Sequence, residues 1–127
     1  MKEKDLYEPI RLWLENDTVN AMGGKRPKTF GFFDVHSQYL NRYLIQKNLT
    51  QCLGAESFGW RIKVDLFGYV QKENSEVKKY IVEVKDKQAS LMDLSQLIGY
   101  SSICNPDRAF LISSGGFSQD LHDLIYK

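Results

Sequence analysis

The chain has 127 residues, of which 43% are hydrophobic and 26% are charged, and its formal net charge is +1. This length suits one domain with a single core and is too short for two separate cores, so residues 1–127 are predicted to form one domain. The near-neutral charge excludes a strongly basic nucleic-acid-binding chain, so any nucleic-acid contact must come from local patches. No apolar run approaches the roughly 20 residues that span a bilayer, and no membrane role is predicted.

The cysteines and histidines give no sign of a metal or disulfide scaffold. Cys52 and Cys104 are isolated, without CxxC spacing, and neither His36 nor His122 has the partner spacing of a metal site or a catalytic triad. Residues 1–5 lead into an amphipathic pattern without the basic and apolar segments of an export signal. We therefore expect reduced thiols and a cytoplasmic protein.

Hydrophobic periodicity divides the chain into helices and strands. In chain order the expected elements are a helix at 5–15, a strand at 30–35, a helix at 39–49, strands at 61–69 and 80–85, a helix at 90–104, a strand at 109–113 and a helix at 117–126. The two middle strands form a hairpin, and a right-handed crossover predicts that the last strand runs parallel to its neighbour. The expected fold is α/β, with a central mixed β-sheet flanked by helices.

Local patterns predict two details of these elements. Ser90 followed by Asp93 resembles a capping box at the start of a helix. Alternation after residue 60 places Ile62, Val64 and Leu66 on one face of a strand. The opposite face is then expected to hold Arg61, Lys63, Asp65, Phe67 and Tyr69.

Three charged residues lie inside strands that are otherwise apolar: Asp65 in the first hairpin strand, and Glu83 with Lys85 in the second. A charge in such a position is costly unless it has a partner or a task. Glu83 and Lys85 are two residues apart and project from the same face, and the adjacent strand can place Asp65 beside them. The sequence therefore predicts a cluster of two carboxylates and a lysine.

Two carboxylates and a backbone carbonyl, such as that of Val84, suit Mg²⁺, which prefers oxygen ligands and retains part of its water. The metal would activate a bound water and neutralise charge on a phosphate, while Lys85 orients the water or stabilises the developing charge. This is the chemistry of phosphodiester hydrolysis. The simpler alternative is a structural ion-pair cluster. A second acid-x-lysine triplet, Glu76-Val77-Lys78, is expected to lie in a polar turn and is interpreted as a chance occurrence.

These residues, in this order, resemble the PD-(D/E)xK nuclease superfamily, whose members share a restriction-endonuclease-like fold. The matching residues are Asp65 and the triplet Glu83-Val84-Lys85. Gln96 and Tyr100 on the following helix are similar to the Gln-x-x-x-Tyr element of helicase-nuclease enzymes. Glu8 matches the acidic residue that many of these families carry on the first helix. The matches cover most of the chain.

The resemblance implies a Mg²⁺-dependent deoxyribonuclease in which Mn²⁺ can substitute for Mg²⁺, with DNA expected as the substrate ahead of RNA. Asp65 and Glu83 would be metal ligands, with the Val84 carbonyl and Glu8 as further ligands. Lys85 would assist the water, and the substrate would be positioned by Gln96 and Tyr100. Spacing alone allows the simpler alternative that Gln96 and Tyr100 bond to each other.

Two features depart from the superfamily pattern. Val64 replaces the proline that names the motif, and a long insertion separates Glu8 from Asp65. A non-catalytic nucleic-acid-binding or assembly module that retains the nuclease fold is the alternative function, and a homodimer or larger nuclease assembly is a further possibility. Basic residues are either a solvated surface or phosphate contacts. The candidates for phosphate contacts are Lys25, Arg26, Lys28, Lys78, Lys79 and Lys87.

Overall fold

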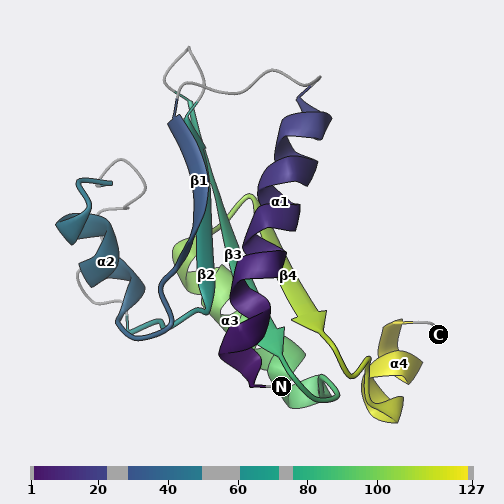
Figure 1. Cartoon of the computed structure of the whole chain (residues 1–127). Helices are drawn as coiled ribbons and strands as arrows, with labels where there is room; N and C mark the ends of the chain where they lie inside the picture. Colours follow the sequence, from purple (N-terminus) through teal and green to yellow (C-terminus); the bar gives the residue numbers. More distant parts are fainter. Residues whose placement is uncertain (1, 23–28, 50–60, 72–75, 126–127) are drawn as a thin grey trace.

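The structure is a computed structural model that describes residues 2–22, 29–49, 61–71 and 76–125 (Figure 1). It is an α/β fold in which helices flank a four-stranded mixed sheet. The elements in chain order are η1 (Glu3–Leu6), α1 (Tyr7–Ala21), β1 (Thr29–Asp34), α2 (Leu40–Gln46), β2 (Leu66–Gln71), β3 (Val77–Lys85), α3 (Leu91–Cys104), β4 (Arg108–Ser113) and α4 (Gln119–Ile125). Within the described ranges, no helix is long and apolar enough to cross a membrane.

The strands lie in the order β1-β2-β3-β4 across the sheet. β1 and β2 are antiparallel, as are β2 and β3, whereas β4 runs parallel to β3. Helix α3 connects β3 to β4, as a connection between parallel neighbours requires. The predicted mixed sheet, hairpin and parallel last strand are confirmed.

Helix α3 begins and ends at residues that the sequence marks. The Ser90 hydroxyl accepts the Asp93 N–H at 3.2 Å, and the Asp93 carboxylate accepts the Ser90 N–H at 2.8 Å, which confirms the capping box. At the other end Asn105 adopts the left-handed conformation, with φ of 50°, and Pro106 follows. Both ends of the crossover are thus set by local sequence.

Helices cover both faces of the sheet. One buried cluster includes Leu97 and Cys104 of α3 together with Phe67, Tyr69 and Ile81 of the sheet. The second cluster packs α1 against the other face through Tyr7, Leu14, Phe32, Leu66, Val82 and Val84. Cys104 is a free, buried thiol, and Cys52 lies outside the described residues.

The predicted alternation around Asp65 is wrong. Ile62 and Val64 belong to the cluster that contains Phe67 and α3, whereas Leu66 belongs to the cluster under α1. The chain bends at Asp65, and regular strand β2 begins only at Leu66. This bend shifts the alternation by one residue, as a bulge does.

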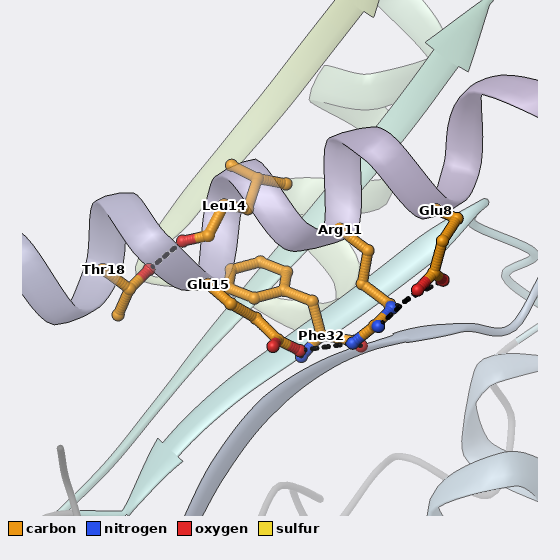
Figure 2. Close-up of polar contacts among 6 residues, drawn as sticks. All are labelled: Glu8, Arg11, Leu14, Glu15, Thr18 and Phe32. Atoms are coloured by element: carbon orange, nitrogen blue, oxygen red, sulfur yellow. Dashed lines mark hydrogen bonds and ion pairs between the residues drawn. The ribbon is translucent and has the colours of Figure 1, made fainter.

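Side chains of α1 bond the outer edge of β1 (Figure 2). The Glu15 carboxylate accepts the Phe32 N–H at 3.0 Å, and Arg11 donates to the Phe32 carbonyl at 3.4 Å. Arg11 also pairs with Glu15 at 2.6 Å and with Glu8 at 2.7 Å. Because β1 is an edge strand, these contacts satisfy backbone groups that its neighbour β2 does not reach. They hold α1 against the sheet.

Phe32 lies over its cross-strand neighbour Gly68. Phe32 is buried, and its ring stacks on Tyr80 at a centroid distance of 5.7 Å. A Cβ atom added to Gly68 would lie 2.4 Å from Phe32 Cε2, which is closer than a carbon contact allows. The glycine therefore makes room for the ring that packs under α1.

We expect Gly68→Ala to lower the free energy of unfolding by about 1–3 kcal/mol, because the Phe32 ring has to leave its position. Gly99→Ala on α3 is the matched control, since a Cβ atom there meets nothing within 4 Å. Alanine favours a helix over glycine by about 1 kcal/mol, so this control should gain stability. Urea unfolding measures both variants, and equal stabilities would contradict the packing.

Candidate functional site

Asp65 is held in place by backbone hydrogen bonds to β3 and to the residue that follows β1. Its N–H donates to the Val82 carbonyl at 3.2 Å, and its carbonyl accepts the Val35 N–H at 3.0 Å. The Asp65 side chain accepts the Tyr7 hydroxyl at Oδ1 and the Val84 N–H at Oδ2, both at 2.8 Å. These bonds position the carboxylate between α1 and β3.

Glu83 is the buried acid of the site, with 6% of its surface exposed. Its Oε1 atom is buried and has no hydrogen-bond partner within the part of the chain that the structure describes. Burial raises the pKa of Glu83 to about 8, and the negative charge of Asp65 acts in the same direction. Glu83 is therefore mostly protonated at neutral pH in the metal-free protein.

Lys85 lies two residues further along β3 and pairs with Asp93 of α3 at 3.5 Å. Partial burial lowers the pKa of Lys85, but nearby acids outweigh this effect, so the pKa lies above its ordinary value. Those acids are, in decreasing order of effect, Asp93, Glu3, Glu83 and Asp65. Lys85 is thus a charged ammonium group surrounded by carboxylates.

Glu3 is the residue at this site that the sequence did not reveal. Tyr7 donates to Glu3 Oε1 at 3.3 Å as well as to Asp65. The charge of Glu3 also raises the pKa of Glu83 and Lys85, so its carboxylate faces the cluster. The available signal was its spacing four residues before Tyr7, which places both on one helical face.

Glu8, the acid predicted from the first helix, has other contacts. It lies on α1 with 66% of its side chain exposed, and its carboxylate pairs with Arg11 (Figure 2). Hydrogen bonding to Arg11 lowers the pKa of Glu8. The role of Glu8 as a metal ligand stays a prediction, but Glu3 is the acid that the structure places at the carboxylates.

Gln96 and Tyr100 contact each other on α3. The Gln96 amide donates to the Tyr100 hydroxyl at 3.0 Å, as the simpler interpretation of their spacing anticipated. Gln96 is one helical turn beyond Asp93, the partner of Lys85, so the three side chains share one side of α3. A contact between this pair and a substrate stays a prediction.

His36 lies beside the cluster through Tyr7. The two rings are 5.3 Å apart between centroids, and His36 Nδ1 is 2.5 Å from Asp34 Oδ1. Neither His36 nor Asp34 was expected near the site, because the β1–α2 connection gives no periodic signal. The contact places this connection along one side of the carboxylates.

A divalent cation fits the carboxylate pair in two respects. Glu83 has a buried oxygen that no other described residue bonds, and Asp65 is close enough to raise the pKa of Glu83. A cation between the two would replace the proton and remove the repulsion between the carboxylates. The Val84 carbonyl faces the same side as its N–H, which bonds Asp65, because both groups of a strand residue point to one neighbour.

The described residues contain no group of three or more histidine, cysteine, aspartate or glutamate side chains arranged to hold a metal ion. The protein ligands available are therefore two carboxylates and a carbonyl, a set that suits Mg²⁺ because this ion keeps several waters. A scan of protein-family models and searches of curated proteins and solved structures found no match to the chain. Function is therefore inferred from this chain's own residues.

Titration of Glu83 should make the metal-free protein less stable as the pH rises. A carboxyl group whose pKa increases from 4.5 unfolded to about 8 folded stabilises the protein fully below pH 4.5, and this contribution is lost as the pH rises through 8. We expect the wild type to lose stability relative to Glu83→Gln over this range, by up to about 1.4 kcal/mol per pH unit.

Chemical denaturation in the presence of a chelator measures this difference at each pH. Asp17→Asn is the control, because Asp17 is an exposed acid in the second half of α1. Its stability should follow that of the wild type at every pH. A constant difference between wild type and Glu83→Gln from pH 4 to 9 would contradict the raised pKa.

Proposed function

We propose that this chain is a metal-dependent nuclease that hydrolyses phosphodiester bonds, with DNA as the substrate ahead of RNA. The observation that carries the proposal is the pairing of Asp65 with Glu83 beside the charged Lys85, together with a buried Glu83 oxygen that has no hydrogen-bond partner among the described residues. A buried pair of acids with a perturbed pKa is typical of a site that exchanges a proton for a metal ion.

The order of the elements also supports a restriction-endonuclease-like fold. Helix α1 is followed by β1, helix α2, the antiparallel strands β2 and β3, the crossover helix α3 and the parallel strand β4, and the candidate residues lie just before β2 and at the end of β3. This is the arrangement that the resemblance to PD-(D/E)xK nucleases implies. Preference for DNA rests on that resemblance alone.

In the proposed mechanism Asp65, Glu83 and the Val84 carbonyl would hold Mg²⁺. The ion would supply an activated water and neutralise charge on the phosphate. Tyr7 donates to Asp65 and fixes the direction of its carboxylate. Glu83 would serve as a ligand in its ionised form, with its proton released to solvent, since a proton and a metal ion compete for the same oxygens.

Lys85 acts as a charged donor in this mechanism. The surrounding acids raise its pKa, so it carries a proton at neutral pH and is unsuited to accept one from water. An ammonium group at this position stabilises negative charge that develops on the phosphate oxygens. Asp93 keeps the group in place by pairing with it at 3.5 Å.

A non-catalytic nucleic-acid-binding or assembly module is the second candidate. Both Asp65 oxygens already accept hydrogen bonds from Tyr7 and Val84, which favours a structural role for this carboxylate. A cytoplasmic location and a homodimer or larger nuclease assembly stay predictions under either function.

Cleavage assays on single-stranded, duplex and branched DNA, with Mg²⁺ or Mn²⁺, test the proposal. We expect Asp65→Asn and Lys85→Ala each to lower the rate at least about 100-fold, because each removes a group that acts on the metal or the phosphate. Arg108→Ala, which removes an exposed cation at the start of β4, is the control and should keep full activity. Equal rates in all four proteins would exclude catalysis at this site.

A second comparison distinguishes the two acids near the N-terminus. Glu3→Gln should lower the cleavage rate more than Glu8→Gln, since Glu3 shares Tyr7 with Asp65 and Glu8 pairs with Arg11. The expected difference is roughly tenfold, which corresponds to about 1.4 kcal/mol of transition-state stabilisation. A larger loss in Glu8→Gln would assign the accessory role to Glu8 instead.

A further inference from the structure

The extended segment that precedes Asp65 runs beside the connection between β1 and α2. The Val35 N–H donates to the Asp65 carbonyl at 3.0 Å, and the Leu40 N–H donates to the Ile62 carbonyl at 2.8 Å. These two bonds hold the segments side by side over several residues. Their outward side chains therefore form one surface that ends at the carboxylate pair.

The outward side of this segment is basic. Ile62 and Val64 are each 1% exposed, so their side chains face the core. In an extended segment alternate side chains point in opposite directions, which places Arg61 and Lys63 outward, and both are exposed. Asp65 follows Lys63 by two residues, a distance of about 7 Å along an extended chain.

The Tyr39 ring contacts one cation from the segment before Asp65 and one cation from α2. The Lys63 ammonium lies 5.1 Å from the centre of the Tyr39 ring, and the Arg42 guanidinium lies 5.5 Å from it. Contacts of this kind stabilise an exposed cation by only about 0.5–1 kcal/mol, so they orient the two groups without neutralising them. We call Arg61, Lys63, Arg42 and the Tyr39 ring the basic strip.

The cations that contact the Tyr39 ring are not paired with acids in the part of the chain that the structure describes. Within the described residues, neither Lys63 nor Arg42 forms an ion pair with a carboxylate. Asp34, the acid at the end of β1, is engaged by His36 at 2.5 Å. A row of exposed cations beside two carboxylates attracts a polyanion, in a chain whose overall charge of +1 provides no general attraction.

We propose that the basic strip binds the backbone phosphates of a nucleic-acid strand and leads it to the carboxylate pair. The cations contact phosphates next to the one that lies at Asp65 and Glu83, and the Tyr39 ring holds two of them in place. This inference deepens the proposed nuclease function and rests on it for the position of the cleaved bond. Phosphate contacts of this kind give affinity and salt dependence without sequence preference.

Fluorescence anisotropy in the presence of a chelator measures binding without cleavage. The probes are labelled single-stranded DNA, duplex DNA and RNA of one sequence. The strip variant is Arg42→Gln/Lys63→Gln, and the matched control is Lys47→Gln/Arg108→Gln, which removes the same charge. Both control residues are exposed: Lys47 follows α2 and Arg108 begins β4, where it also lies over an aromatic ring, that of Phe110, at 5.2 Å.

We expect the strip variant to bind single-stranded DNA roughly tenfold more weakly at low salt, and the control to bind like the wild type. The slope of log K against log salt should fall by about 1.4, since each lost phosphate contact on a single strand removes about 0.7. Unchanged affinity and slope in the strip variant, or no binding of any probe by the wild type, would overturn the proposal. The three probes show which strand type the strip accepts.

Two further measurements keep this result separate from the nuclease proposal. If the wild type cleaves no substrate but the strip variant loses nucleic-acid binding, the basic strip is the binding surface of a non-catalytic module and the nuclease proposal is wrong. If the wild type cleaves DNA and the strip variant keeps the KM of the wild type, the binding role of the basic strip is wrong and the nuclease proposal is retained. Arg61→Gln removes a cation that the Tyr39 ring does not hold, and it replaces the double variant if that protein does not fold.

Discussion

The hydrogen bonds of Asp65 join the sheet and the first helix at one point. Its backbone bonds Val35 after β1 and Val82 in β3, and its carboxylate bonds Tyr7 of α1 and the Val84 N–H. These four contacts lie at the bend just before β2 begins, where the face of the sheet that successive residues bury changes. Asp65 thereby connects α1, β3 and the β1–α2 connection at the site.

The site places two carboxylates that repel each other beside a positively charged lysine. Glu83 is buried near Asp65, and its raised pKa lets it keep a proton that an exposed glutamate would lose at neutral pH. Lys85 lies near these acids and pairs with Asp93. Since Asp93 also caps α3, the position of the lysine is tied to the start of the crossover helix. Acids placed close together in a buried site lower the stability of a protein, and they are retained where function requires them. This arrangement fits a pair of acids that binds a cation.

The sequence predicted most of the fold because its signals are local. Periodicity, the Ser90–Asp93 capping box and the charges inside apolar strands each depend on residues that are close in sequence. The bend at Asp65 could not be predicted, because it depends on hydrogen bonds to distant segments. Glu3 was not predicted because it lies in a 3-10 turn before the periodic helix. The basic strip was not predicted because its cations come from two segments that are distant in sequence.

The proposed site requires that Asp65 and Glu83 together hold a divalent cation. Crystals of the protein soaked in Mn²⁺ and measured at the manganese absorption edge show whether they do. We expect an anomalous peak between the two carboxylates, at about 2.0–2.3 Å from an oxygen of each, the range in which divalent cations bind carboxylates. Ordered carboxylates without such a peak, at a pH above the Glu83 pKa of about 8, would contradict it.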